Sequence, residues 1–214
     1  MIQNKNIIFI AAHFDDLELG CGGTISKLNK NNNIKVVIIC NSEFYDVNNK
    51  LLRDKKIAKK EGATALNKLG IKNKQVNFYN FNTFEIQKKE YEISHQLIKL
   101  NIKNNFDIIF THWENDVHPD HKNLNSICNS VFKNTRTFIE FSSNFYHENF
   151  VPNFFINISE QYHKKINSID SHESEMKRTK NIWKTYFIQQ CKNDGIRFKE
   201  KYVERFRAKR IFMV

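Results

Sequence analysis

The sequence predicts an α/β fold: a three-layer sandwich in which helices cover both faces of a mainly parallel sheet, followed by a helical C-terminal extension. Short apolar and β-branched runs of strand length alternate with longer segments of helical spacing, the pattern of parallel strands joined by crossover helices. With two prolines and six glycines, the 214 residues leave little room for a flexible linker. We therefore expect one domain over residues 1–214.

The first half of the chain supplies two strands and two helices. Residues 7–12 (IIFIAA) form an apolar run of strand length, and residues 20–29 can form a helix. Residues 34–40 (IKVVIIC) are rich in β-branched side chains, which favours a second strand. Residues 51–69 have apolar side chains at helical spacing, and Gly70 is a suitable end for that helix.

The same alternation continues toward the C-terminus. Helices are expected at residues 86–101 and 120–132, and the long polar segment 159–191 is expected to be mostly helical with a break. Three more strands are predicted at residues 75–81 (QVNFYNF), 106–112 (FDIIFTH) and 136–142 (RTFIEFS).

Clusters of histidine and aspartate follow the first and fourth predicted strands. The stretch AAHFDDLELGCGG spans residues 11–23, and HWENDVHPDH spans residues 112–121. In a parallel sheet of strand order 3-2-1-4-5, the first and fourth strands are neighbours at the topological switch point, where ligands bind beyond the carboxyl ends of the strands. We expect the two clusters to meet there.

The chemistry of these clusters suits a divalent metal ion. Asp15 and Asp16 repel each other, so a positive charge is expected near them. His118 and His121 share one face or lip of a helix if Pro119 opens it. Two imidazoles and a neighbouring carboxylate suit a zinc ion, and so do one histidine and one aspartate from the first loop. Catalytic zinc usually has three protein ligands and a fourth position open to water. Any one of these histidines alone would be an ordinary loop residue.

Both clusters resemble the signatures of the LmbE/PIG-L family of zinc-dependent N-deacetylases. AHFDDLELGCGGTI is similar to the family's AHPDDxElGcGGTi, and DVHPDH is similar to its second signature. Weaker similarity runs through LLRDKKIAKKEGATALNKLG, KINSIDSHESE and EKYVERF, so the resemblance covers nearly the whole chain. It implies a Rossmann-like α/β domain.

The resemblance also implies roles for particular residues. His13, Asp16 and His121 would bind the metal, either Zn²⁺ or another divalent ion such as Fe²⁺, and Asp15 would be the general base that activates water. Two departures from the family pattern, Phe14 in place of proline and Leu17 where many relatives have glutamate, remove no ligand.

Three further assignments follow from the same resemblance. His118 would polarise the substrate carbonyl and stabilise the developing oxyanion, as a protonated donor. Asp120 would support the site from outside the ligand set. Arg53 would face the substrate, although a solvated arginine in the first turn of its helix is an equal alternative.

The function implied is removal of the N-acetyl group from an N-acetylated amino sugar, such as an N-acetylglucosamine moiety of a metabolite, sugar nucleotide or glycoconjugate precursor, with release of acetate. A deacetylase of a low-molecular-weight thiol pathway, acting on a glucosaminyl-malate type molecule, is the alternative within this class. Aromatic residues in SEFYDV, FYNFNTF and SSNFYHENF fall in loops at the same sheet edge and could stack on sugar faces.

The composition of the chain suggests an alternative function, binding of nucleotides or nucleic acid instead of catalysis. The net charge of +11 would suit a basic module that binds nucleotides or nucleic acid, but lysine is spread along the chain, which favours a small-molecule substrate and no specific nucleic acid. GCGG lacks the GxGxxG spacing of dinucleotide sites, so close helix packing is expected there.

The sequence also bears on compartment and assembly. Four cysteines without a CxxC pair are expected to be reduced, buried thiols. No apolar run reaches the roughly 18 residues of a membrane span, and the N-terminus lacks a signal-peptide pattern. We expect a cytoplasmic protein without a membrane span, and a homo-oligomer is an open alternative to a monomer.

Overall fold

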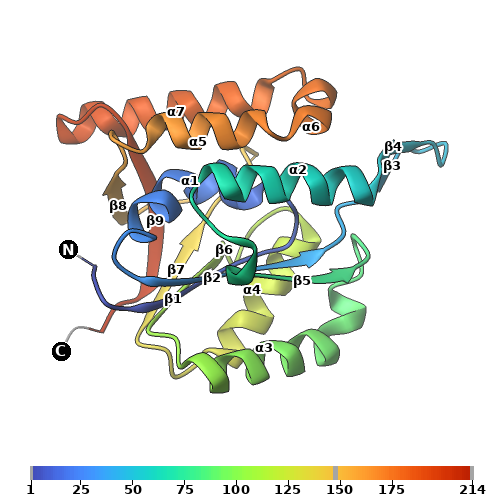
Figure 1. Cartoon of the computed structure of the whole chain (residues 1–214), viewed down its shortest axis with the longest axis horizontal. Coiled ribbons are helices and arrows are strands. Elements are labelled where there is room, and N and C mark those ends of the chain that lie inside the picture. The colour runs from blue at the N-terminus through green and yellow to red at the C-terminus, as the bar shows by residue number, and fades with distance from the viewer. Residues whose placement is uncertain (1, 147–148, 213–214) are drawn as a thin grey trace.

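A seven-stranded sheet forms the centre of the molecule (Figure 1). The computed structural model describes residues 2–146 and 149–212. The strand order is β5-β2-β1-β6-β7-β9-β8. The first five of these pair in parallel and reproduce the expected order 3-2-1-4-5. Their bounds are β1 Asn6–Ala11, β2 Asn33–Cys40, β5 Val76–Phe81, β6 Ile108–His112 and β7 Thr137–Phe141.

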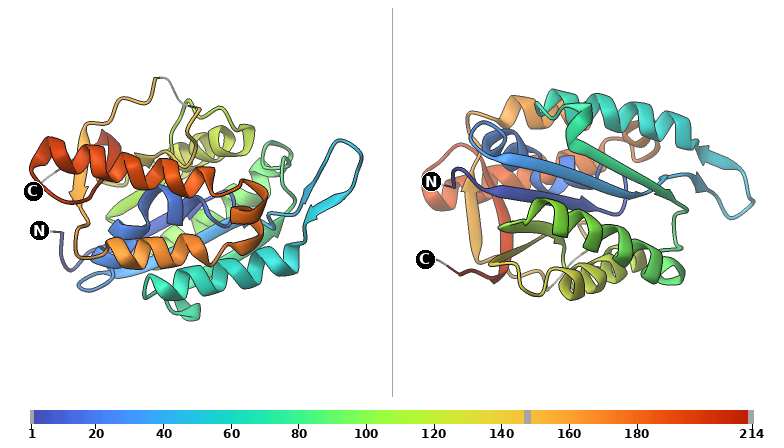
Figure 2. Two further views of the ribbon diagram at one scale, coloured as in Figure 1. Left: turned by 90° about the horizontal axis from the view of Figure 1, so that it is seen from above. Right: turned by 60° about the horizontal axis from the view of Figure 1, so that its bottom comes forward.

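Helices cover both faces of this sheet, which confirms the predicted α/β class. On one face lie α3 (Glu90–Asn104) and α4 (Pro119–Val131), which come forward in the right view of Figure 2. On the other face lie α1 (Asp16–Leu28) and α2 (Lys55–Lys68). The C-terminal helices pack over α1 and α2 as an outer cover (Figure 1). They are α5 (Tyr162–Asp170), α6 (Glu173–Arg178) and α7 (Ile182–Phe198).

The sheet extends beyond the predicted strands. Two antiparallel strands, β9 (Val203–Arg210) and β8 (Phe154–Asn157), continue it past β7. Two 3₁₀ turns, Asn73–Gln75 and Gln87–Lys89, precede β5 and α3. No helix within the described residues is both long and apolar enough to cross a membrane.

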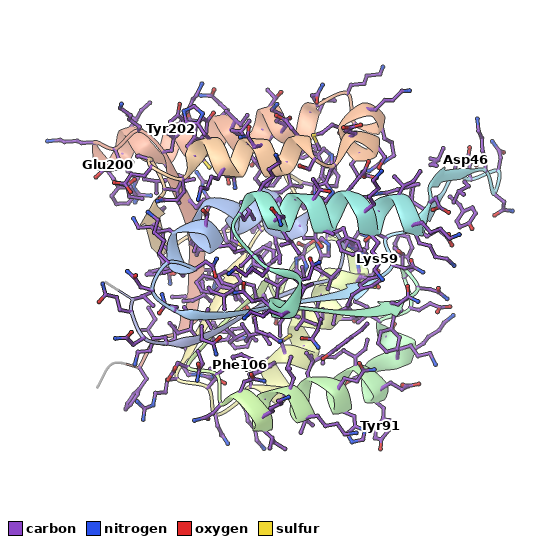
Figure 3. The ribbon with its side chains drawn as sticks, viewed as in Figure 1. Asp46, Lys59, Tyr91, Phe106, Glu200 and Tyr202 are labelled. Atoms are coloured by element: carbon purple, nitrogen blue, oxygen red, sulfur yellow. The ribbon has the colours of Figure 1, made fainter. Side chains whose placement is uncertain are left out.

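The helix predicted at residues 51–69 begins later than expected. Residues Leu51–Arg53 form β4, which pairs with β3 (Phe44–Tyr45) in a small hairpin. This hairpin projects from the body of the molecule, and Asp46 lies on it in Figure 3. Asp54 then starts α2, because its side chain accepts hydrogen bonds from the backbone N–H groups of Lys56 and Ile57. Arg53 therefore lies on a strand and not in a helical turn.

The glycine cluster of α1 allows close packing, as expected. A Cβ atom on Gly23 would lie 2.6 Å from Ile158 Cδ1, and one on Gly20 would lie 2.6 Å from Phe141 Cδ2. Helix α1 also begins earlier than predicted, at Asp16, so the two aspartates stand at its N-terminus.

All four cysteines are buried free thiols.

A buried ion pair fixes α1 to the C-terminal elements. The Nζ atom of Lys165 on α5 lies 2.6 Å from Oε1 of Glu204 on β9 and 2.6 Å from the Leu19 carbonyl oxygen. The same carboxylate accepts hydrogen bonds from the backbone N–H groups of Gly23 and Thr24. Because these groups are out of contact with water, each depends on the others for its hydrogen bonds.

Replacing one partner of this pair should destabilise the fold strongly. We expect Lys165→Met to lower the free energy of unfolding by about 3–5 kcal/mol, since it leaves the Glu204 carboxylate buried without a cation. Urea denaturation measures the change. The neighbouring exposed Lys164 provides the control, because Lys164→Met should stay within roughly 0.5 kcal/mol of the parent. Equal losses in the two variants would contradict this role of the pair.

Candidate metal centre and active site

The two histidine and aspartate clusters meet at the carboxyl edge of β1 and β6, as expected. They line a pocket of about 260 Å³ that also receives side chains from the β3–β4 hairpin, the loop after β5, and α6 and α7. Among the sequence-predicted site residues, His13, Asp15, Asp16, Arg53, His118 and His121 all line it.

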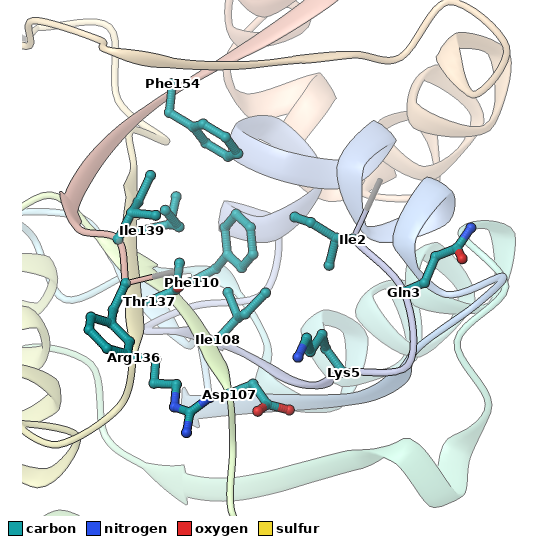
Figure 4. Close-up of a pocket in the computed structure, with 12 residues that line it drawn as sticks. Ile2, Gln3, Lys5, Asp107, Ile108, Phe110, Arg136, Thr137, Ile139 and Phe154 are labelled. Atoms are coloured by element: carbon teal, nitrogen blue, oxygen red, sulfur yellow. The ribbon is translucent and has the colours of Figure 1, made fainter. Parts of the chain in front are cut away.

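A larger cavity of about 600 Å³ lies at the other edge of the sheet (Figure 4). Its walls are mainly apolar and include Ile108, Ile139 and Phe154, with Lys5 and Asp107 among its charged residues. None of the described residues that line it is a histidine or a cysteine, so these residues offer no donor set for a transition metal. The chemistry of the clusters belongs to the smaller pocket.

Three side chains in that pocket are spaced as metal ligands. His13 Nδ1 lies 3.2 Å from His121 Nε2 and 3.4 Å from Asp16 Oδ2, and His121 Nε2 lies 3.3 Å from Asp16 Oδ1. Donors about 2.0–2.1 Å from a tetrahedral zinc ion stand about 3.3–3.4 Å apart. Ser143 Oγ and the His13 N–H donate to the Asp16 carboxylate, at 2.8 Å each, and hold it in place. The donor set therefore fits a divalent ion.

Two further aspartates orient the imidazoles. Asp120 Oδ2 lies 3.1 Å from His13 Nε2, and Asp116 Oδ2 lies 3.0 Å from His121 Nδ1. A carboxylate can only accept, so each of these nitrogens carries the proton. The lone pairs of His13 Nδ1 and His121 Nε2 are thereby turned toward each other and toward Asp16, and a cation among them would relieve their repulsion.

Protonation equilibria reflect the same crowding of negative charge. Burial alone would lower the pKa of His13, but the hydrogen bond to Asp120 and the contacts with Asp16 raise that pKa well above its usual value. In the same way the pKa of His121 rises to about 9, because Asp16 and Asp116 outweigh burial. Without a metal, the imidazoles therefore tend to hold the protons that a divalent ion would displace.

Other triplets of possible donors surround this set. Among the described residues, three groups have ligand atoms within 4.8 Å of one another: His13, His118 and His121; His13, Cys40 and Asp120; and Asp16, His112 and His121. His112 belongs to the last, but its Nε2 accepts the Ala12 N–H at 3.0 Å, and burial lowers its pKa to about 4. That hydrogen bond ties β6 to the loop after β1.

Asp15 has the properties of a general base. Its backbone lies at φ 100° and ψ −30°, and its side chain makes no capping hydrogen bond to α1 although it precedes that helix. The carboxylate is free to face the pocket, where Arg53 Nη1 lies 3.5 Å away. Burial raises the pKa of Asp15 to about 7 against the opposing charge of Arg53. A base with a pKa near the working pH is suited to proton transfer.

His118 presents a neutral donor instead of the protonated one expected. Its Nδ1 accepts the Asp120 N–H at 3.2 Å, which places the ring proton on Nε2. Burial, with the charges of His13 and His121, lowers the pKa of His118 to about 3. The ring also stacks on Phe84, with centroids 5.1 Å apart. An Nε2–H of a neutral imidazole can still donate a hydrogen bond to an oxyanion.

Arg53 is not a solvated arginine. Its side chain is 4% exposed and is surrounded by acidic groups. Nη1 contacts Asp15 and, at 3.6 Å, Glu175, whereas Nη2 lies 3.4 Å from Glu61 and 3.3 Å from His172 Nδ1. Arg53 thus connects the hairpin, α2 and α6 behind Asp15.

Some site residues were missed from the sequence. Asp116 is one of three acidic residues in the second motif, with Glu114 and Asp120, and the sequence does not show which of them contacts a histidine. No sequence pattern marks Ser143. Of the aromatic loop residues, Phe44 and Phe84 line the pocket. Phe145 packs against Trp183, with ring centroids 6.2 Å apart, beside the pocket. In the third aromatic stretch, residues 147 and 148 lie outside the described residues.

Comparison with known proteins gives a family match over residues 8–132, to the model described as PIG-L: GlcNAc-PI de-N-acetylase. Solved structures share the fold. The N,N'-diacetylchitobiose deacetylase of Pyrococcus horikoshii is 20% identical, with a TM-score of 0.76 over 95% of this chain and 83% of that one.

Two other structures show the breadth of this fold. The hydratase GalB of Pseudomonas putida KT2440, a 4-carboxy-2-hydroxymuconate hydratase, is 15% identical, with a TM-score of 0.76 over 98% of each chain. The zinc inhibited form of teicoplanin deacetylase Orf2 is 12% identical, with a TM-score of 0.71 over 95% of this chain and 98% of that one.

The contact between Asp116 and His121 leads to a prediction about metal affinity. Asp116→Asn should weaken Zn²⁺ binding by about 10- to 100-fold, because the amide has no charge and only one acceptor oxygen for the two donors, the His118 N–H and His121 Nδ1–H, that the carboxylate holds. Competition with a chromogenic chelator measures the affinity. Asp107→Asn, at the opposite edge of the sheet, is the control and should bind as the parent does. Unchanged affinity in Asp116→Asn would show that this carboxylate does not support the ligand.

Proposed function

The chain belongs to the PIG-L (LmbE-like) family of deacetylases, and on this premise we propose that it is a metal-dependent hydrolase that removes the N-acetyl group from an N-acetylated amino sugar and releases acetate. The observation that carries the proposal is the pairing of a metal-ligand set with a buried carboxylate, Asp15, whose pKa is raised to about 7. A structural relative with hydratase activity shows that fold alone does not decide the reaction.

In this proposal His13, Asp16 and His121 hold the ion. When bound, a divalent ion supplies Lewis-acid polarisation of the substrate carbonyl and makes nearby water more acidic. Asp120 and Asp116 keep the two imidazoles in the ligating tautomers, as their distances to the rings support.

The other site residues move protons. An oxygen of Asp15 accepts the proton of the attacking water as the C–O bond to the acetyl carbon forms. His118 Nε2–H donates a hydrogen bond to the oxygen that becomes the oxyanion. The C–N bond then breaks, and the amine nitrogen takes the proton that Asp15 accepted from the water, giving acetate and the free amino sugar. Arg53 holds Asp15 from behind, which makes it a positioning residue in this scheme.

The test is acetate release from a panel of N-acetyl sugars, by metal-free protein reloaded with Zn²⁺ or Fe²⁺. We expect turnover only with metal, and a fall of about 10²- to 10⁴-fold in Asp15→Asn, the usual contribution of a general base. That variant should bind metal nearly as tightly as the parent. Asp170→Asn, which changes an exposed carboxylate, is the matched control. Metal-independent turnover, or an Asp15→Asn variant as active as the control, would refute the scheme.

A second candidate substrate carries a negative charge beside the sugar, as a glucosaminyl-malate type molecule does. Arg178 lines the pocket, between the rings of Phe44 and Trp183 at 5.2 and 6.0 Å. Glu175 occupies its Nε and Nη2 atoms, and within the described residues Nη1 makes no hydrogen bond. A guanidinium so placed can bind a carboxylate or phosphate.

Arg178→Gln separates the two substrates. If the carrier is anionic, this change should raise KM for the anionic compound by roughly tenfold or more, the value of one charge-assisted hydrogen bond. KM for neutral N-acetylglucosamine should stay within about twofold, because no charge is lost there. Parallel initial-rate measurements on the two compounds provide the comparison. Equal effects on both would remove the support for an anionic carrier.

A further inference from the structure

The position and backbone conformation of Phe84 are not explained by a contribution of this residue to the stability of the fold. Phe84 follows β5 and lines the metal-site pocket, and the residue is 55% exposed. Its backbone adopts φ 65°, the left-handed region that a bulky residue rarely enters. A large apolar side chain in this position gains little from burial while its backbone is strained. Such residues persist mainly where a functional site requires them.

Two backbone contacts and one ring contact hold Phe84 at the pocket. The Phe84 N–H donates to Asp120 Oδ2 at 2.7 Å, and the Ile86 N–H lies 3.5 Å from Asp120 Oδ1. One side of the ring stacks on the imidazole of His118, at an interplanar angle of 17°. Among the described residues this is the ring's only aromatic partner, and more than half of the residue's surface is exposed at the pocket that it lines.

We propose that Phe84 is a specificity-determining residue whose ring stacks on the apolar face of the sugar. The inference rests on the proposed function and deepens it. A pyranose has a face of C–H groups that packs against an aromatic ring, and burying both surfaces provides binding energy without a hydrogen bond. His118 covers one face of the ring, so the sugar would stack on the other face, and its N-acetyl group would reach past the ring edge into the pocket that both residues line.

The strained backbone provides a test that separates this role from a structural one. Phe84→Gly removes the ring and also relieves the left-handed strain, because glycine adopts positive φ without a steric penalty. We expect the melting temperature to fall by no more than about 2 °C or to rise, while KM for the N-acetyl sugar increases about tenfold and kcat changes by less than about twofold.

Asn80→Gly is the matched control for strain relief. Asn80 is also left-handed, at φ 62°, and is exposed on β5 outside the pocket. Its replacement should leave both KM and sugar binding unchanged. Phe84→Leu keeps the apolar volume and the strain but has no ring, so it should raise KM as Phe84→Gly does. Phe84→Trp should restore a KM within about threefold of the parent, since it returns an aromatic face.

A readout without catalysis keeps this proposal separate from the deacetylase proposal. Saturation-transfer-difference NMR with metal-free protein and N-acetylglucosamine should show saturation of the sugar's ring protons, lost in Phe84→Gly and kept in Asn80→Gly. Parent protein that binds the sugar in this way without releasing acetate from any substrate would refute deacetylation alone. A parent with no ring-proton signal, an unchanged KM in Phe84→Gly and Phe84→Leu, or a loss confined to kcat would overturn the stacking role.

Discussion

The need to balance negative charge shapes the site. Two loops from neighbouring strands bring Asp15, Asp16, Asp116 and Asp120 together around imidazoles, in a region largely removed from water. Carboxylates at this density repel one another in a low dielectric, where charges interact more strongly than in water. Arg53 offsets part of that charge behind Asp15, and protons or a divalent ion must offset the rest. The spacing of His13, Asp16 and His121 favours the ion.

The fold supplies this crowding through sheet topology and close packing. Because β1 and β6 are parallel neighbours, the segments that follow them leave the sheet at the same edge. Helix α1 is held near that edge by its glycines and by the Lys165–Glu204 pair, so its N-terminal aspartates have a fixed position. The outer layer of C-terminal helices packs on α1 and so helps to hold the helix that begins at Asp16, one of the proposed metal ligands.

The sequence was informative where a signal is local. Apolar, β-branched runs identified the five parallel strands, and the two signatures identified the loops that form the candidate metal site, because both depend on residues near one another along the chain. It was uninformative where pairing is long-range. Strand β9 (VERFRAKR) is highly charged, yet it lies in the sheet because β7 and β8 pair with it on either side. The hairpin strands β3 and β4 are too short to give a periodic signal.

The same limit applies within the site. The proximity of Asp116 to His121 depends on how the loop before α4 folds, and the tautomer of His118 depends on the backbone N–H of Asp120. Arg53 is surrounded by Glu61 and Glu175, residues that only tertiary packing brings together. These contacts determine the protonation states of the site residues. A sequence motif does not show which contacts the folded chain will make, so it cannot predict these protonation states.

One carboxylate connects the two halves of the pocket. Asp120 accepts from the ring of His13 on one side and from the backbone of Phe84 on the other. An ion that moves His13 would therefore also alter the hydrogen bond between Asp120 and the backbone N–H of Phe84. Thermodynamic linkage makes such an effect mutual: binding at the metal site should change the affinity of the site at Phe84, and binding at Phe84 should change the affinity for the metal by the same factor. If the ion and the sugar bind as proposed, their two affinities are therefore coupled through Asp120.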